Sequence, residues 1–128
     1  MKERSYYISQ ITVPIVEYRY EKEKANVSGQ LESTYAVQMK NPFMESRGVA
    51  FHCTVTADIH APGITAKIVT EAIVGINDAK EIPDGEDMNQ ITQVFSAPLR
   101  AKITEIFAYL TGNTKPFPLI LRGESAIS

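Results

Sequence analysis

The chain has 128 residues, of which 44% are hydrophobic and 22% charged, and its formal net charge is −2 at pH 7. This length fits one domain over residues 1–128, and the composition argues against a disordered chain. The absence of a basic surplus argues against a dedicated nucleic-acid binder, because such proteins neutralise phosphates with lysine and arginine. The single cysteine excludes an intramolecular disulfide.

The sequence offers no segment typical of membrane insertion or secretion. Its first ten residues, MKERSYYISQ, lack the apolar stretch of a signal peptide, and its longest apolar runs are far shorter than a membrane-spanning helix. We therefore expect a cytoplasmic protein that does not insert into membranes.

The first half of the sequence predicts strands. Tyr, Ile and Val are frequent over residues 5–20, at both odd- and even-numbered positions. Pro14 argues against a long central strand there. Residues 31–40 alternate between apolar and polar, which is typical of a half-buried strand. Residues 41–48 read as a loop that carries two unusually apolar residues, Phe43 and Met44.

The middle of the sequence predicts a β-hairpin. Residues 49–60 and 64–76 both alternate with period two, and Ala61-Pro62-Gly63 between them suits a tight turn. Apolar residues lie on both faces at the end of the second strand, which indicates that both faces are covered there.

From Glu86 the apolar period becomes helical. Pro98 predicts a break near Ser96 and hence two helices, the second with an apolar stripe through Leu99, Ile103 and Phe107. Strands followed by helices indicate an α+β fold. We expect a four-stranded antiparallel sheet followed by a helix pair packed on one face.

No constellation of residues predicts catalysis. The glycines are too widely spaced for a phosphate-binding loop. His52 and His60 share a strand face but lie eight residues apart, about 26 Å along a strand, too far to ligate one metal ion. Cys53 has the parity of a buried, inert thiol. We expect a protein without enzymatic activity, cofactor or metal.

Apolar residues exceed what one covered sheet face can bury, which predicts a homo-oligomer, either a dimer or a tetramer. The candidate interface residues are Ile11, Val13, Val69 and Ile73.

Three stretches carry a resemblance to a known family. The strand pair FHCTVTADIH and ITAKIVTEAIVGI, the segment SAPLRAKITEIFAYLTGN and the closing PFPLIL are similar to the SecB export-chaperone family. The resemblance implies tetramers and the binding of unfolded polypeptides in long apolar grooves. On this chain the matching groove residues are Phe43, Met44, Met88, Ile91, Val94 and Phe95.

One position departs from the family. Lys67 aligns with an acidic residue that docks the translocation ATPase in the family, and this charge reversal argues against such docking. Two alternatives to a chaperone stay open. One is a structural interaction module for a single dedicated partner, such as an antitoxin. The other is a small-molecule-binding protein that would use Cys53, Tyr35 and Thr70.

Overall fold

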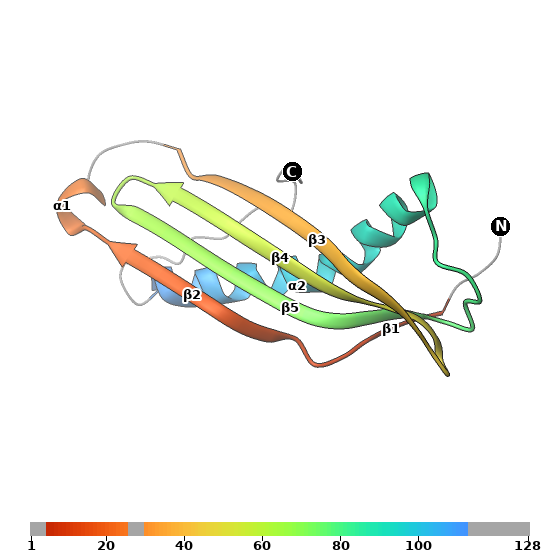
Figure 1. Cartoon of the computed structure of the whole chain (residues 1–128). Coiled ribbons are helices and arrows are strands. Elements are labelled where there is room, and N and C mark those ends of the chain that lie inside the picture. The colour runs from red at the N-terminus through yellow and green to blue at the C-terminus, as the bar shows by residue number, and fades with distance from the viewer. Residues whose placement is uncertain (1–4, 26–29, 113–128) are drawn as a thin grey trace.

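The computed structural model describes residues 5–25 and 30–112 of the chain. Five strands form one antiparallel sheet in the order β1-β5-β4-β3, and β2 also pairs with β5. The strands are β1 (Tyr6–Ile8), β2 (Thr12–Tyr20), β3 (Glu32–Glu45), β4 (Gly48–Ala61) and β5 (Ile64–Asn77). A short helix, α1 (Lys22–Ala25), follows β2, and the long helix α2 (Gly85–Gly112) follows β5. Figure 1 shows α2 crossing behind the sheet, which confirms the α+β class.

The hairpin predicted over residues 49–76 is the centre of the sheet. β4 and β5 pair from Gly48 opposite Asn77 to Ala61 opposite Ile64 without a shift in register. Gly63 in the turn has φ of 75°, a conformation that glycine adopts without a steric cost. This part of the prediction is confirmed.

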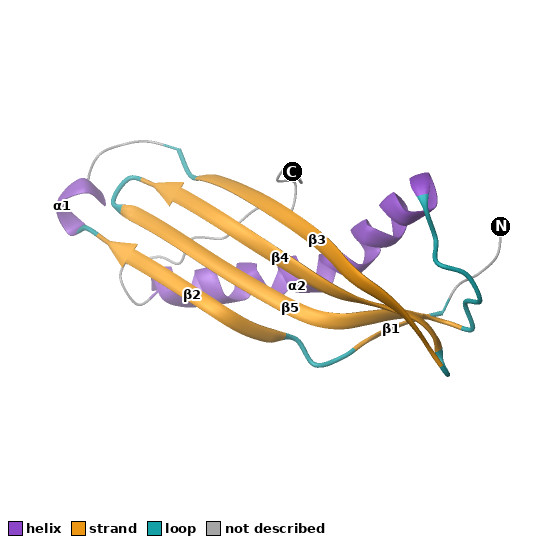
Figure 2. Cartoon of the chain, in the orientation of Figure 1, coloured by secondary structure: helices purple, strands orange, loops and turns teal. Residues whose placement is uncertain are grey.

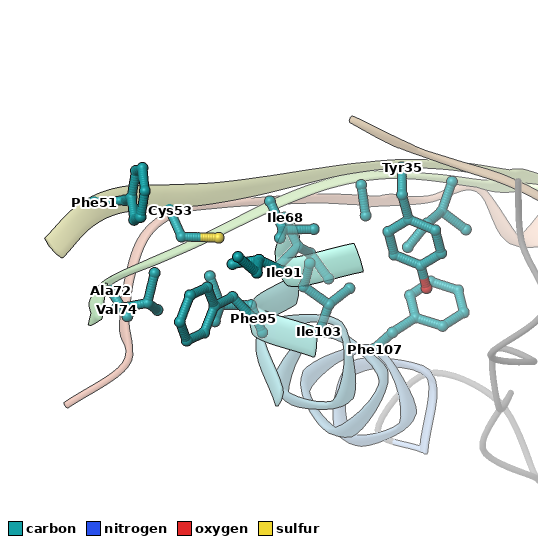
Figure 3. Close-up of a cluster of buried hydrophobic side chains, with 14 of the residues drawn as sticks. Tyr35, Phe51, Cys53, Ile68, Ala72, Val74, Ile91, Phe95, Ile103 and Phe107 are labelled. Carbon is teal, nitrogen blue, oxygen red and sulfur yellow. The ribbon is translucent and has the colours of Figure 1, made fainter. Parts of the chain in front are cut away.

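The core lies between the sheet and α2. Odd-numbered residues of β4 and even-numbered residues of β5 face the helix, because strand side chains alternate between faces. On α2 the residues that meet them recur every four positions and are all buried: Ile91, Phe95, Leu99, Ile103 and Phe107. Figure 3 shows four residues of this stripe, Ile91, Phe95, Ile103 and Phe107, on the side of the sheet to which Ile68, Val74 and Tyr35 point. Burial of such side chains is the main stabilising contribution to a fold of this size.

The first predicted strand is two strands, so the sheet has five strands rather than four. β1 pairs with Val74–Ile76 and β2 with the rest of β5, so both lie along one edge of β5. The chain leaves the ladder between Ile8 and Thr12, and a second irregularity lies between Thr12 and Ile15. Pro14 falls at that irregularity, where a residue without an N–H is tolerated.

Residues 41–45 continue β3 and do not form the predicted loop. The register shifts between Lys40 and Phe43, and pairing then resumes with Phe43 opposite Ala50 and Met44 opposite Val49. Pro42 lies at this shift on an edge strand, which is one of the few places where a sheet accepts proline. The loop-like appearance of Asn41-Pro42 therefore marks a bulge.

The predicted helix pair is one helix of 28 residues with Pro98 inside it. The proline ring removes the N–H that would bond the Val94 carbonyl, but both residues are exposed, so water can satisfy that carbonyl. Ser96, where the break was predicted, lies inside the helix, and its hydroxyl donates to the Gln93 carbonyl one turn back. Figure 2 shows the uninterrupted helix behind the sheet; among the described residues, no helix or strand covers the opposite, helix-free face. The closing stretch PFPLIL, residues 116–121, lies outside the described residues.

Candidate functional site

The structure does not gather the six predicted groove residues in one place. Ile91 and Phe95 are core residues, and Met88 is half-buried against the core. Val94 is 49% exposed on α2, and Met44 is 53% exposed on the helix side of β3. Phe43 lies on the helix-free face, where its ring meets the His52 ring at 5.8 Å between centroids. Only Val94 and Met44 present largely exposed apolar surface on the helix side.

The four predicted interface residues also divide between two places. Val69 and Ile73 point to the helix-free face of β5, opposite Thr56 and His52. Ile11 and Val13 are half-buried and pack against the core cluster. A homo-oligomer stays a prediction. Of the four residues only Val69 and Ile73 lie on the helix-free face, and of these Ile73 is 37% exposed whereas Val69 is buried.

Apolar side chains of β1 form an exposed margin of the core. Tyr6 and Ile8 lie opposite Ile76 and Val74 on the helix side of the sheet. The Tyr6 ring meets the Phe95 ring edge-on at 5.2 Å, yet Tyr6 is 38% and Ile8 40% exposed. We call Tyr6, Ile8, Phe95 and Val94, the residue that precedes Phe95 in α2, the apolar margin. Sequence reasoning did not select Tyr6 or Ile8, although apolar residues at both parities of this segment were a signal that both faces are used.

Tyr7 holds β1 from the other side of the sheet. Its ring lies directly over Gly75, in space that the Cβ of any other residue would occupy. The Arg47 guanidinium is 3.7 Å from the ring centroid, and the Tyr7 hydroxyl donates a hydrogen bond to the Glu45 carboxylate. Partial burial, followed by the hydrogen bond to Glu45, raises the pKa of Tyr7 above its ordinary value. Tyr7 thus connects β1 to β5 and to the β3–β4 turn. The hydroxyl keeps its proton at neutral pH and remains a donor.

Hydrogen bonds of Ser5 and Ser9, the residues that flank β1, complete its attachment to β5. The Ser9 N–H donates to the Ile73 carbonyl, and the Asn77 N–H donates to the Ser5 carbonyl, both at 2.8 Å. The Ile73 N–H donates to the Ser9 hydroxyl at 2.9 Å. The Asn77 side-chain amide donates to the Ser5 hydroxyl at 3.0 Å. These bonds are exposed, and exposed hydrogen bonds open more readily than buried ones.

Polar and charged residues occupy much of the helix-free face. Lys67 is exposed there, directly opposite Asp58 on one side and Glu17 on the other. Residues directly opposite each other in a ladder have Cβ atoms about 5 Å apart, so opposite charges in this row attract. Over the described ranges 5–25 and 30–112, no group of three or more His, Cys, Asp or Glu residues could hold a metal ion.

The residues proposed for a small-molecule pocket are packed in the core. Tyr35 and Cys53 are fully buried, and the Thr70 hydroxyl donates to the Leu99 carbonyl of α2 at 3.2 Å. A shallow hollow of about 300 Å³ does exist on the helix-free face, next to the gap between β1 and β2. Its lining residues are Ser9, Gln10, Thr12, His52, Thr54, Glu71, Ala72 and Ile73. It is open to solvent and contains none of the three core residues.

Burial also determines the chemistry of Cys53. Desolvation raises the pKa of its thiol to about 11, so the nucleophilic thiolate is nearly absent at neutral pH. We expect native protein at pH 8 to react with a thiol-specific aromatic disulfide reagent at least about 100-fold more slowly than protein in guanidinium chloride. Absorbance of the released thiolate measures both rates. Comparable rates in the two conditions would show that Cys53 is accessible.

Comparison with known proteins gives a likeness in structure alone. No family model matches the sequence, and no curated protein matches it. Among the described residues, no helix is long and apolar enough to cross a membrane.

Two solved structures share the fold. A protein of unknown function from Streptococcus agalactiae has a TM-score of 0.63 at 12% identity, over 94% of this chain and 99% of that one. A SecB-like chaperone from Mycobacterium tuberculosis, in complex with a ChAD peptide from the HigA1 antitoxin, has a TM-score of 0.67 at 17% identity. That match covers 91% of this chain and 86% of the chaperone. The chain therefore has the fold of a SecB-like chaperone.

Proposed function

We propose that this chain is a SecB-like chaperone or peptide-binding protein that holds unfolded or extended polypeptides without catalysis or a cofactor. The observation that carries the proposal is the apolar margin: Tyr6 packs edge-on against the core residue Phe95 and is still 38% exposed, and Ile8 on the same strand and Val94 on the same helix are exposed as well. Water-exposed apolar surface that continues a core favours a partner which covers it, and an extended polypeptide offers apolar side chains at alternate positions.

The fold likeness supports a polypeptide as the bound partner. The M. tuberculosis chaperone holds a peptide from an antitoxin, so a chain folded in this way can bind a short polypeptide segment. The same complex favours a second candidate function, a module dedicated to one partner protein. The two differ in selectivity: a chaperone binds many unfolded chains, whereas a dedicated module binds one segment and ignores the others.

Docking of a translocation ATPase is not part of the proposed function. Lys67 is exposed between Asp58 and Glu17, so this row of the helix-free face carries mixed charge and not an acidic patch. Electrostatic steering of a charged partner needs a surface of one sign.

Substitution of Val94 tests the proposal at the apolar margin. We expect Val94→Asp to weaken binding of a reduced, carboxymethylated polypeptide at least about tenfold, because a hydrated carboxylate would have to lose water against an apolar segment. Since Val94 is 49% exposed, its replacement leaves the thermal stability nearly unchanged. Fluorescence anisotropy of the labelled polypeptide measures the affinity. Phe95→Asp is unsuitable, because that change buries a charge in the core.

Tyr109→Asp is the matched control. Tyr109 lies on the same helix and is 72% exposed, but it is four helical turns from the apolar margin. Its replacement should leave the affinity within about twofold of the unsubstituted chain. Equal affinity of the Val94→Asp variant and the unsubstituted chain would place the polypeptide elsewhere.

A further inference from the structure

β1 is attached to the sheet over a much shorter length than the long strands β3, β4 and β5. It has three residues, whereas β3, β4 and β5 have 14 each. It lies at the edge of the sheet and is separated from β2 by Ser9, Gln10 and Ile11, which are outside any strand. The side-chain hydrogen bonds at its two ends are exposed, so we expect β1 to open at a lower free energy than β3, β4 and β5.

β5, the strand with which β1 pairs, is held in the sheet without β1. β5 stays paired with β4 over its full length, so β5 needs no help from β1 to remain a strand. On its β1 side, the alternate residues Ile73 and Asn77 present their backbone groups to β1, and Gly75 lies between them opposite Tyr7. We call this stretch, Ile73–Asn77, the acceptor edge. A strand edge of this kind recognises another extended backbone through its hydrogen bonds.

Side chains next to the acceptor edge give it selectivity. On the helix side, Tyr6 lies against Phe95 and Ile76, and Ile8 lies opposite Val74. On the helix-free side, Gly75 leaves room for a flat ring, which Tyr7 fills beneath the Arg47 guanidinium. The acceptor edge thus accommodates three successive side chains: an aromatic one on the helix side, a flat aromatic one on the helix-free side and an aliphatic one on the helix side.

We propose that the acceptor edge of β5 binds an extended polypeptide segment as an added antiparallel strand, and that β1 occupies this edge in the unbound protein. The proposal rests on the proposed function, and it names the site and the class of segment: the segment takes the place of Tyr6 and Ile8 in the apolar margin, and Phe95 and Val94 of α2 remain. The preferred segment has an aromatic residue, a second aromatic residue and an aliphatic residue at three successive positions, and it contains no proline. Such a segment offers the same classes of side chain as Tyr6, Tyr7 and Ile8, in the same order.

Competition with β1 sets the apparent affinity. A segment binds only in the fraction of molecules whose β1 has left the edge, so the measured affinity falls in proportion to that fraction. Tyr7 controls the fraction through its hydrogen bond to Glu45, its contact with Arg47 and its fit over Gly75. Removal of the Tyr7 side chain therefore releases β1 but leaves the acceptor edge intact.

A reversible disulfide tests the proposal in the full chain. Ser5 and Asn77 already touch through their side chains, so the double variant Ser5→Cys/Asn77→Cys can staple β1 to β5. Cys53 is buried and does not compete for the new thiols. The probes are a fluorescein-labelled peptide of residues 3–11 and a labelled, reduced and carboxymethylated polypeptide without thiols. The control peptide carries serine in place of Tyr6, Tyr7 and Ile8.

We expect the reduced double variant to bind both probes and the oxidised form to bind each at least about tenfold more weakly. The control peptide should bind neither form. If oxidation leaves the affinity for the unfolded polypeptide unchanged, the acceptor edge is overturned while the proposed function stands. If the peptide of residues 3–11 binds and the unfolded polypeptide does not, the edge stands and the general chaperone function fails. If the reduced protein binds neither probe, both fail.

Tyr7→Ala gives a second test that needs no disulfide. We expect this variant to bind the peptide of residues 3–11 roughly three- to tenfold more tightly than the unsubstituted chain, since β1 leaves the edge more often. Tyr20→Ala, a change of the same size on β2 away from the acceptor edge, should have no such effect. Weaker or unchanged binding by the Tyr7→Ala variant would contradict the proposal.

Discussion

Phe107→Ala is expected to lower the free energy of unfolding by about 3–5 kcal/mol, the usual effect of removing a fully buried phenylalanine side chain. Phe107 is inaccessible to solvent and packs beneath Tyr35, near the end of α2 away from β1 (Figure 3). The neighbouring side chains come from a sheet that cannot collapse into the space, so a cavity remains. Guanidinium chloride unfolding followed by far-ultraviolet circular dichroism measures the change.

Tyr109→Ala is the control for this measurement. Tyr109 lies two residues further along the same helix and is 72% exposed, so its replacement should change the stability by less than about 0.5 kcal/mol. If the two variants unfold at the same denaturant concentration, then α2 does not pack on the sheet through Phe107.

Gly48→Ala is expected to destabilise the chain by about 3 kcal/mol or more, which is unusual for the addition of a single methyl group. Gly48 opens β4 with φ of 143°, a conformation that residues with a Cβ rarely adopt. A Cβ at this position would also overlap the Ile76 carbonyl oxygen, which belongs to the backbone of the paired strand and cannot move aside. The destabilisation should appear as a midpoint temperature of thermal unfolding below that of the unsubstituted chain.

Gly85→Ala separates the two causes of that effect. Gly85 also has a positive φ, of 57°, but nothing lies within 4 Å of the position of a Cβ. Its replacement therefore costs only the conformational strain, about 1 kcal/mol. Similar losses in both variants would mean that the contact between Gly48 and the β5 backbone is absent.

The central hairpin could be predicted from the sequence because local and tertiary preferences agree there. Residues 49–60 alternate cleanly, residues 64–76 keep one continuous apolar face, and the turn that joins them has a glycine with the positive φ that the turn requires. The stripe of α2 was predictable for the same reason, since Leu99, Ile103 and Phe107 recur at helical spacing and are all buried.

Two prolines account for the loop and the helix break that were wrongly predicted. A proline read from sequence indicates an interruption, but the cost depends on whether the missing N–H had a buried partner. The residue whose carbonyl loses its partner at Pro98 is exposed, and Pro42 falls at a register shift of an edge strand, so in both cases the element continues. Pro14 lies in the edge strand β2, in agreement with the prediction that this segment is not a long central strand. Exposure and edge position are tertiary facts that local patterns do not contain.

The candidate site was harder to predict than the fold. Periodicity marks a residue as apolar and on one face, but it does not separate a core position from the wall of a groove. Ile91 and Phe95 were predicted groove residues that lie in the core, whereas Val94, one position away, is exposed. The role of Tyr6, Tyr7 and Ile8 depends on Phe95, Gly75 and Arg47, which are remote in sequence.

The central claim is that this chain holds unfolded polypeptides. Size-exclusion chromatography with light scattering, on the full chain mixed with a reduced, carboxymethylated polypeptide, tests it most directly. Co-elution in one peak, with the mass of the protein and the polypeptide together, is the result that we predict. Separate elution of the polypeptide from correctly folded protein, at concentrations of both well above the micromolar range, would contradict the claim.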